Sequence, residues 1–439
     1  MRMGQLFLRV VGRAGRGGLG LLLAAGWALG GHAQARPAAA GALVESATLF
    51  QFRQPKRQRT AVPLRIERNL PVVQATLNGA GPFNFLLDTG VAVSLITNPQ
   101  LADSLHLPRG EQFRVVGAGR EATGLLAYQA DGVRVALGPH VVAPALTWLV
   151  LSDDVLNLSG YVGMPIAGIL GSELFRSFVV RFEPEAGRLA LAAPAGYRPP
   201  QGRSWVQVPL QLAQNKAYLT LPVALTDSAA RPLKLVLDTG AGHALSLETD
   251  ALPPRVALPA HRLPAELGRG LTGIVRGHLG RIDSLRLGRY RIPAVLASFP
   301  TPNPLAVRPD EPRDGNLGYE VLKRFTLVVD YPHGRLWLRP NTRFGEPFEH
   351  NMSGLELRAG GYRLRRYVVA TVAAATPAAK AGILVDDELL SVNFGPAADL
   401  SLTQLSRLLQ VADNHLLFLT LRHADGELYT TYLRLKRQI

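Results

Sequence analysis

The feature that most constrains the fold of this chain is a long internal repeat. The segment 85–90, which ends in Asp-Thr-Gly, recurs at 235–240, an offset of 150 residues. A glycine-bearing segment at 168–173 recurs at 315–320, an offset of 147 residues. Because the two blocks return in the same order and in nearly the same register, the sequence predicts two successive lobes that share one architecture.

The local patterns within each repeat are typical of β-strands. Apolar or alternating runs extend from 62 to 87 and from 206 to 237, and the first run is interrupted by Asn78-Gly79, which favours a hairpin turn. Glycine and proline are frequent, with 44 and 32 residues, and long helical patterns are scarce. We therefore predict a mainly β fold with two pseudo-symmetric β-barrel lobes over residues 61–198 and 199–345.

The sequence pattern changes after residue 345. Residues 366–372 and 389–393 are typical of strands, residues 377–382 of a short helix that ends at a glycine, and residues 401–411 of an amphipathic helix. The sequence has no second copy of this pattern. We predict a separate small α+β domain over residues 346–439.

The amino terminus has the pattern of an export signal. Four arginines and no acidic residue accompany an apolar run at 19–29, and residues 33–35 form a small-x-small cleavage pattern. The alternative is an uncleaved membrane anchor, but this run is shorter than the ~20 residues that span a bilayer. We predict a signal peptide over 1–35, a linker over 36–60, and an exported protein that is periplasmic or extracellular. Cleavage near Ala35 lowers the net charge from +15 to +11.

Composition excludes several kinds of chemistry. The chain has no cysteine, which excludes thiol nucleophiles, thiolate metal sites and disulfides. The sequence contains neither H-E-x-x-H nor G-x-S-x-G, so we predict no catalytic metal, no cofactor and no α/β-hydrolase site. Basic residues cluster only at 53–59, without a recognition-helix context, so we predict no nucleic-acid partner. Carboxylates are left as the candidate catalytic groups.

Asp88 and Asp238, one from each repeat, form the candidate catalytic pair. Each follows an apolar run, where burial of a lone carboxylate is unfavourable. The glycine of each motif allows a sharp turn, and the threonine hydroxyl can bond across a pseudo-dyad. The predicted supporting residues are Thr89, Gly90, Thr239 and Gly240. Two carboxyl groups at close range cannot both ionise, so one would keep its proton.

On these motifs, and on the partner glycines at 169–171 and 316–318, the chain resembles the retropepsin and pepsin superfamily of aspartic proteases. As a whole it resembles exported bacterial aspartyl-protease-family proteins that end in a PDZ domain. The resemblance implies an aspartic-type endopeptidase, a hydrolase of peptide or protein substrates, in which the dyad activates a water. The duplication supplies both halves of the site within one chain, so a monomer is predicted. Flap hairpins are expected at 115–137 and 267–287.

The carboxy-terminal domain resembles PDZ domains in three segments, residues 366–372, 377–383 and 386–393. The resemblance implies that an extended peptide adds as a strand beside one edge, with a side chain against the 401–411 helix. The alternative is a structural cap whose groove is empty.

Two departures from the family pattern leave a second function open. Val91 stands where the family has Ala or Ser, and Asn316 stands where an apolar residue is usual. The alternative is a non-catalytic peptide-binding or scaffold protein that retains the protease fold. Residues 268–273 satisfy the dinucleotide pattern G-x-G-x-x-G, but no βαβ pattern surrounds them, so a hairpin is predicted there. His243 is predicted to be a partly exposed loop histidine.

Overall fold

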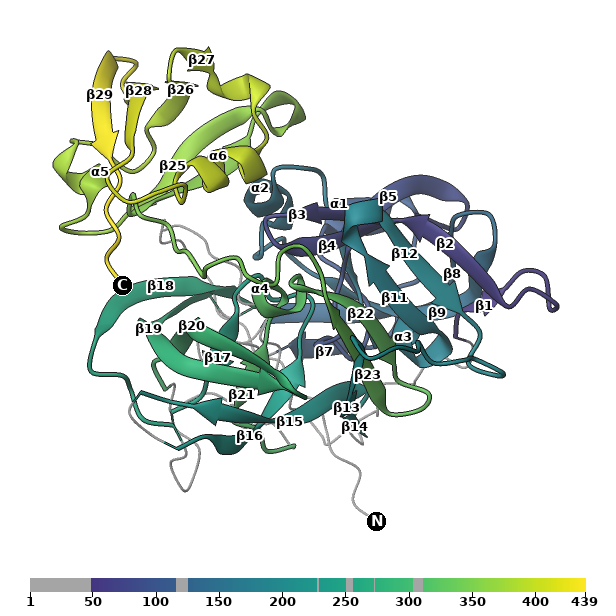
Figure 1. Ribbon diagram of the computed structural model, residues 1–439. Helices are drawn as coiled ribbons and strands as arrows, with labels where there is room; N and C mark the ends of the chain where they lie inside the picture. Colours follow the sequence, from purple (N-terminus) through teal and green to yellow (C-terminus); the bar gives the residue numbers. More distant parts are fainter. Residues whose placement is uncertain (1–48, 116–124, 227–228, 250–255, 272, 303–310) are drawn as a thin grey trace, which may run out of the picture.

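The computed structural model describes residues 49–115, 125–226, 229–249, 256–271, 273–302 and 311–439 (Figure 1). The predicted signal peptide and residues 36–48 of the predicted linker lie outside the described residues. Strands dominate the described chain, and none of the helices in it is long and apolar enough to cross a membrane. The prediction of a mainly β chain is confirmed.

The first lobe contains a nine-stranded sheet and three short helices. Its strands are β1 (Gln51–Phe52), β3 (Arg65–Glu67), β4 (Leu70–Leu77), β5 (Ala80–Leu87), β6 (Leu95–Ile96), β7 (Gln112–Val115), β8 (Leu125–Leu137), β9 (Val141–Leu151) and β10 (Gly168–Leu170), and its helices are α1 (Pro99–Ser104), α2 (Leu158–Val162) and α3 (Ser172–Ser177). The sheet order is β1-β9-β6-β10-β5-β4-β8-β7, with β3 paired to β4. Asn78 and Gly79 turn the β4–β5 hairpin with φ angles of 51° and 89°, the left-handed region that a two-residue turn requires.

The second lobe repeats this plan in an eight-stranded sheet. Its elements are β14 (Gln211–Ala213), β15 (Lys216–Ala224), β16 (Arg231–Leu237), β17 (Leu245–Leu247), β18 (Arg262–Gly270), β19 (Gly273–Leu287), β20 (Tyr290–Pro300), β21 (Gly315–Leu317) and the helix α4 (Tyr319–Leu322). The sheet order is β14-β15-β16-β21-β17-β20-β19-β18. Each sheet therefore places the strand that leads into Asp-Thr-Gly beside the strand of its partner glycine.

The two partner-glycine strands occupy equivalent positions. β10 runs parallel to β5 with Gly168 beside Phe85, and β21 runs parallel to β16 with Gly315 beside Leu235. A Cβ atom on either glycine would lie 1.9 Å from a carbonyl oxygen of the antiparallel neighbour strand. Only glycine fits at these two positions, which explains why the repeat includes them.

A six-stranded sheet joins the two lobes. Its strands are β2 (Arg59–Pro63), β11 (Val179–Glu183) and β12 (Arg188–Ala192) from the first lobe, and β13 (Val206–Pro209), β22 (Phe325–Asp330) and β23 (Arg335–Pro340) from the second. The order is β13-β23-β22-β11-β12-β2, so the two lobes meet at the β11–β22 pair, where Val180 lies opposite Val329. This sheet was not predicted from the sequence. Each lobe contributes three strands to this sheet, so the sheet has the same pseudo-symmetry as the two lobes.

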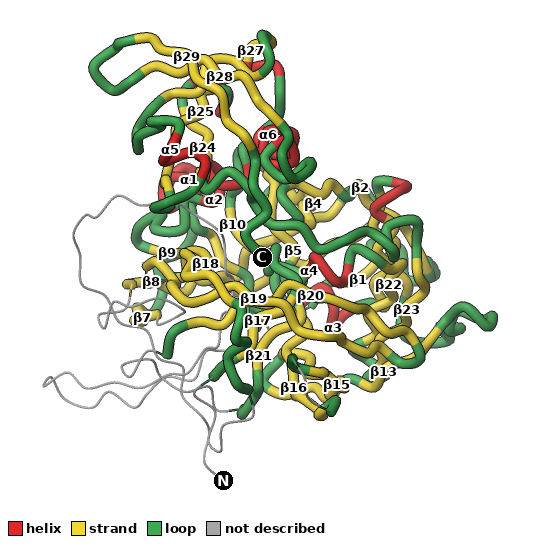
Figure 2. Tube along the Cα trace, turned by 60° about the vertical axis from the view of Figure 1, so that its left-hand side comes forward, coloured by secondary structure: helices red, strands yellow, loops and turns green. Residues whose placement is uncertain are grey.

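The carboxy-terminal domain has its own apolar core. Its elements are β24 (Leu355–Gly360), β25 (Arg366–Val372), α5 (Pro377–Lys380), β26 (Glu388–Val392), β27 (Gly395–Pro396), α6 (Leu402–Leu408), β28 (Leu416–Arg422) and β29 (Leu428–Arg434). The sheet order is β24-β25-β26-β28-β29, with β27 paired to β26. Ser401 and Gln404 form a capping box that starts α6. Figures 1 and 2 both place this domain against the first lobe, with α6 near α2.

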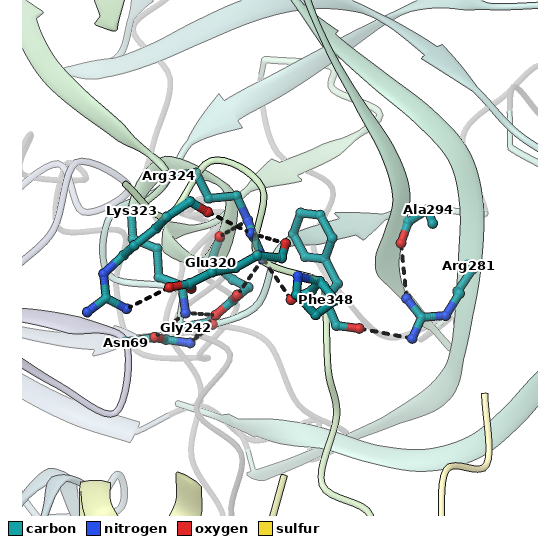
Figure 3. Close-up of polar contacts among 11 residues, drawn as sticks. Asn69, Gly242, Arg281, Ala294, Glu320, Lys323, Arg324 and Phe348 are labelled. Atoms are coloured by element: carbon teal, nitrogen blue, oxygen red, sulfur yellow. Dashed lines mark hydrogen bonds and ion pairs between the residues drawn. The ribbon is translucent and has the colours of Figure 1, made fainter. Parts of the chain in front are cut away.

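Arg324 fixes the linker between the second lobe and this domain (Figure 3). Its side chain is fully buried, and its guanidinium donates to the linker carbonyl oxygens of Arg343 at 3.2 Å and Pro347 at 3.3 Å. It also forms an ion pair with Glu320 at 3.0 Å and lies over the Phe348 ring at 3.8 Å from the centroid. A buried guanidinium needs such partners, because without them its burial is very unfavourable.

We expect Arg324→Met to lower the free energy of unfolding by about 3 kcal/mol. The change removes one donor to Glu320 and leaves the linker carbonyls of Arg343, Glu346 and Pro347 without their guanidinium donor. Chemical denaturation followed by tryptophan fluorescence measures the change. Arg203→Met, at an exposed position, is the matched control and should change the midpoint little. Equal midpoints for the two variants would contradict this account of the linker.

Candidate active site

Both Asp-Thr-Gly turns begin where a buried strand ends. The backbone N–H of Asp88 donates to Leu170 O at 2.9 Å, and that of Asp238 donates to Leu317 O at 3.0 Å. Each aspartate is therefore held by the partner-glycine strand of its own lobe. Neither aspartate side chain is exposed to solvent.

The two threonines cross between the lobes. Thr89 Oγ1 donates to Leu237 O at 2.6 Å, and Thr239 Oγ1 donates to Leu87 O at 2.9 Å. Each hydroxyl also accepts the backbone N–H of the other threonine, at 3.1 Å and 3.0 Å. The four hydrogen bonds are reciprocal, so each lobe fixes the position of the other lobe's active-site turn.

The two glycines let the turns approach each other closely. A Cβ atom on Gly240 would lie 2.2 Å from Cγ of Asp88, a distance that no real contact shows. A Cβ atom on Gly90 would lie 3.0 Å from Oδ1 of Asp238 and 3.1 Å from Oδ1 of Asp88. The structure thus brings all six predicted site residues together, with the two carboxyl groups adjacent.

The two carboxyl groups differ in their surroundings. Burial raises the pKa of Asp88 to about 6, although the backbone N–H groups of Gly90 and Gly240 act in the opposite direction. Burial, followed by the charge of Asp88, raises the pKa of Asp238 well above its ordinary value. Because the two buried carboxyl groups are adjacent, their titrations are coupled, and over an interval of pH the pair holds one proton.

Asn316 contacts the dyad directly, which the sequence analysis did not predict. Its Nδ2 donates to Oδ2 of Asp238 at 2.7 Å, and its side chain is 1% exposed. The equivalent residue of the first lobe is Ile169, which is buried in an apolar cluster. On the sequence this departure leaves the scaffold alternative open, and in the structure the Asn316 amide is a donor to a dyad carboxyl. The sequence signal for this contact is that Asn316 lies in β21, the strand that pairs directly with the strand leading into Asp238.

Val91, the other departure, lies in the core of the first lobe. It is 1% exposed and belongs to the same apolar cluster as Leu86 and Ile169. Its second-lobe equivalent, Ala241, is also buried. An apolar residue suits this position in both lobes.

The expected flap of the second lobe is a long β-hairpin. β18 pairs with β19 from Arg262 opposite Gly280 to Gly270 opposite Gly273. The described residues of the G-x-G-x-x-G segment, 268–271 and 273, lie at its tip and lead into strand β19 rather than into a helix, as the predicted hairpin requires. In the first lobe β7 and β8 form the matching pair, and residues 116–124 of that expected flap lie outside the described residues.

A cavity of about 680 Å³ adjoins the active-site turn of the second lobe. Its walls come from all three parts of the chain, including Asn69, the residues 242–244 that follow the second Asp-Thr-Gly, the strand β18 and the helix α6. Neither aspartate lines it. His243 is partly exposed in this cavity, yet both of its ring nitrogens are buried without a hydrogen-bond partner among the described residues. Burial lowers the pKa of His243 to about 4, so its imidazole is neutral near pH 7.

Comparison with known proteins agrees with this geometry. Residues 73–174 match the family described as aspartyl protease, and residues 368–423 match the family described as PDZ domain. The chain is also similar to the crystal structure of basic 7S globulin from soybean, with a TM-score of 0.39 and 10% sequence identity over 66% of this chain and 97% of that chain. A search of curated proteins gave no match. The chain thus carries an aspartyl protease domain and a PDZ domain.

Proposed function

We propose that this protein is an aspartic-type endopeptidase in which Asp88 and Asp238 activate one water molecule. The observation that carries the proposal is the reciprocal pairing of Thr89 and Thr239, because it holds a carboxyl group from each lobe at one place. The family match of residues 73–174 supports a protease-like function for this region.

The surroundings of each carboxyl group suggest its role. We assign Asp88, which accepts the N–H of Gly90 at 2.6 Å, as the anion that takes a proton from the attacking water. Asp238 keeps its proton and donates a hydrogen bond to the scissile carbonyl as negative charge develops there. The proton taken by the dyad then goes to the leaving nitrogen, which balances the reaction and restores the starting state.

We also propose a peptide partner for the PDZ domain and export of the protein. PDZ domains bind extended peptides by strand addition, and residues 368–423 match that family. Export rests on the arginine-rich, apolar amino terminus and the small-x-small pattern before residue 36. The two-lobe site within one chain supports a monomer.

Replacement of either aspartate should abolish peptide cleavage. Asp88→Asn removes the base and Asp238→Asn removes the acid, so each single variant should lose at least about 100-fold in kcat/KM. The thermal melt should not fall, since a neutral amide is easier to bury than a carboxylate. Digestion of a denatured-protein mixture, with and without a statine-type inhibitor, gives the readout. Asp103→Asn, on the exposed side of α1, is the control. Full activity in either dyad variant would contradict the shared-water mechanism, whereas absence of cleavage by the parent would favour the scaffold function.

The pH dependence of cleavage should follow the two raised pKa values. Below about pH 6 Asp88 becomes protonated and the dyad lacks a base, so kcat/KM should fall as pH decreases through that value. At higher pH the second proton leaves Asp238, and kcat/KM should fall again. Initial rates on one peptide between pH 3 and about pH 10 test this, and a profile that keeps rising below pH 5 would contradict it.

A further inference from the structure

The free edge of the PDZ sheet is already occupied. β24 is the end strand of its sheet, and strand addition needs its outward-facing backbone groups. Leu355 O accepts from Asn351 Nδ2 at 2.6 Å, and Leu357 O accepts from Arg68 Nη1 of the first lobe at 3.3 Å. Two acceptors that an added peptide strand would use therefore have other donors.

Arg68 is held firmly in this position. Its guanidinium forms an ion pair with Glu356 at 3.1 Å and donates to Tyr161 O at 3.3 Å. It also stacks over the Tyr161 ring at 4.3 Å from the centroid, and its side chain is only 9% exposed. Arg68 thus connects α2 of the first lobe to β24 of the PDZ domain through buried, charge-assisted contacts.

The turn that carries Arg68 has an unusual backbone conformation and contacts the PDZ domain directly. Arg68 and Asn69 form the two-residue turn between β3 and β4, with φ angles of 47° and 62°. Asn tolerates this conformation, whereas Arg rarely adopts it because its Cβ atom crowds the backbone there. The turn is also tied to α6, because the N–H of Arg68 donates to Thr403 Oγ1 at 3.1 Å and that hydroxyl donates to Glu67 at 2.7 Å.

The end of α2 closes the rest of this interface. Gly163, directly after α2, has a φ of 81°, and a Cβ atom on it would lie 2.7 Å from Cβ of Leu402 in α6. Helix α2 also lies against β24. The first lobe therefore covers both walls of the PDZ groove, the strand β24 and the start of the helix α6.

We propose that the first lobe is the resident occupant of the PDZ groove, so that an extended peptide and the Arg68 turn compete for strand β24. A peptide would add to β24 only when the PDZ domain moves away from the first lobe. Its apparent affinity is then reduced by the fraction of molecules in which the groove is open. Peptide binding to the PDZ domain would thus be coupled to loss of the contact between strand β24 and the first lobe.

Full-length variants test the competition, in an Asp88→Asn background that keeps probe peptides intact. The probes are an array of ten-residue peptides with free carboxyl ends, together with hydrogen exchange of residues 355–360. Arg68→Ala should capture at least about tenfold more peptide than the parent and should expose the β24 amides to faster exchange. Thr403→Val weakens the same contact from the PDZ side and should act in the same direction. Arg53→Ala, at an exposed position, should match the parent.

Two outcomes would overturn the competition. One is that Arg68→Ala and Thr403→Val both leave peptide capture and β24 exchange at the parental level. The other is that the parent already binds array peptides without any change in the exchange of β24 or α2, because the peptide would then sit elsewhere. If Arg68→Ala fails to fold, Thr403→Val alone decides between these results.

A second inference concerns Asn316 and rests on the proposed function. Each dyad carboxyl has one oxygen held by a protein donor, Asp88 Oδ1 by the N–H of Gly90 and Asp238 Oδ2 by Asn316. The other two oxygens, Asp88 Oδ2 and Asp238 Oδ1, are buried without a hydrogen-bond partner among the described residues. These oxygens are the ones left for a proton, a water and a substrate.

We infer that Asn316 is a positioning residue that engages Oδ2 of Asp238 and so directs the proton of this carboxyl to Oδ1. Three other groups interact electrostatically with the dyad. Lys216 acts on Asp88, Arg313 acts on Asp238, and the pKa of Tyr331 is raised in part by the charges of both aspartates. None of them takes the Oδ2 position. The amide is also a donor that favours the anion of Asp238, in opposition to burial.

Asn316→Ile, which installs the residue of the other lobe, tests this role. Loss of the donor should move the alkaline limb of the kcat/KM profile upward by about one pH unit, because the donor favours the anion of Asp238. The acidic limb, set by Asp88, should move less. Asn316→Ser, whose side chain is too short to keep the contact, provides a second variant in case isoleucine disrupts folding.

The result separates this inference from the proposed function. If the parent cleaves peptides and both Asn316 variants keep the parental alkaline limb, the positioning role is wrong and the protease assignment stands. If the parent cleaves no peptide in the same assay, the protease assignment itself fails. A uniform loss of kcat at all pH values, with both limbs unmoved, would indicate a purely structural role for the amide and would also overturn the inference.

Discussion

The exchange of hydrogen bonds between Thr89 and Thr239 is the interaction on which the rest of the site depends. Each threonine bonds to the strand end of the opposite lobe, so neither Asp-Thr-Gly turn has its observed geometry without the other lobe. The burial of both aspartates follows, and burial is the main cause of their raised pKa values. The contacts that pair the lobes therefore also create the buried environment in which the two carboxyl groups share a proton.

Two of the contacts that attach the PDZ domain to this core differ in their chemistry. Arg324 holds the linker through buried backbone carbonyls, which ties the domain to the second lobe regardless of any ligand. Arg68 holds the domain to the first lobe through the edge of β24, which is the surface that a peptide would need. An added peptide would displace the Arg68 contact but not the Arg324 contact. The cavity beside the second active-site turn is lined by Arg68 and by Glu320, the ion-pair partner of Arg324. Movement at the Arg68 contact would change the walls of that cavity.

Much of the architecture could be predicted because the signals are local or repeated. The two Asp-Thr-Gly motifs, their partner glycines and the Asn78-Gly79 turn each report on the backbone within a few residues, and duplication made them recognisable. The inter-lobe sheet and the Arg68 contact could not be predicted in the same way. Both join segments far apart in the sequence, 180 with 329 and 68 with 357, and no local pattern specifies such a partner. The role of Asn316 was hidden for the same reason, since it depends on the register of β21 against β16.

Duplication explains how one dyad can contain two unlike carboxyl groups. Two identical lobes would surround their aspartates identically, and a shared proton would then have no preferred position. In this chain the lobes differ beside the carboxyl groups, with the amide of Asn316 in one and the hydrocarbon of Ile169 in the other. This difference leaves the threonine exchange between the lobes intact. The amide of Asn316 favours the anion of Asp238, in opposition to burial, so the two carboxyl groups titrate in unlike surroundings.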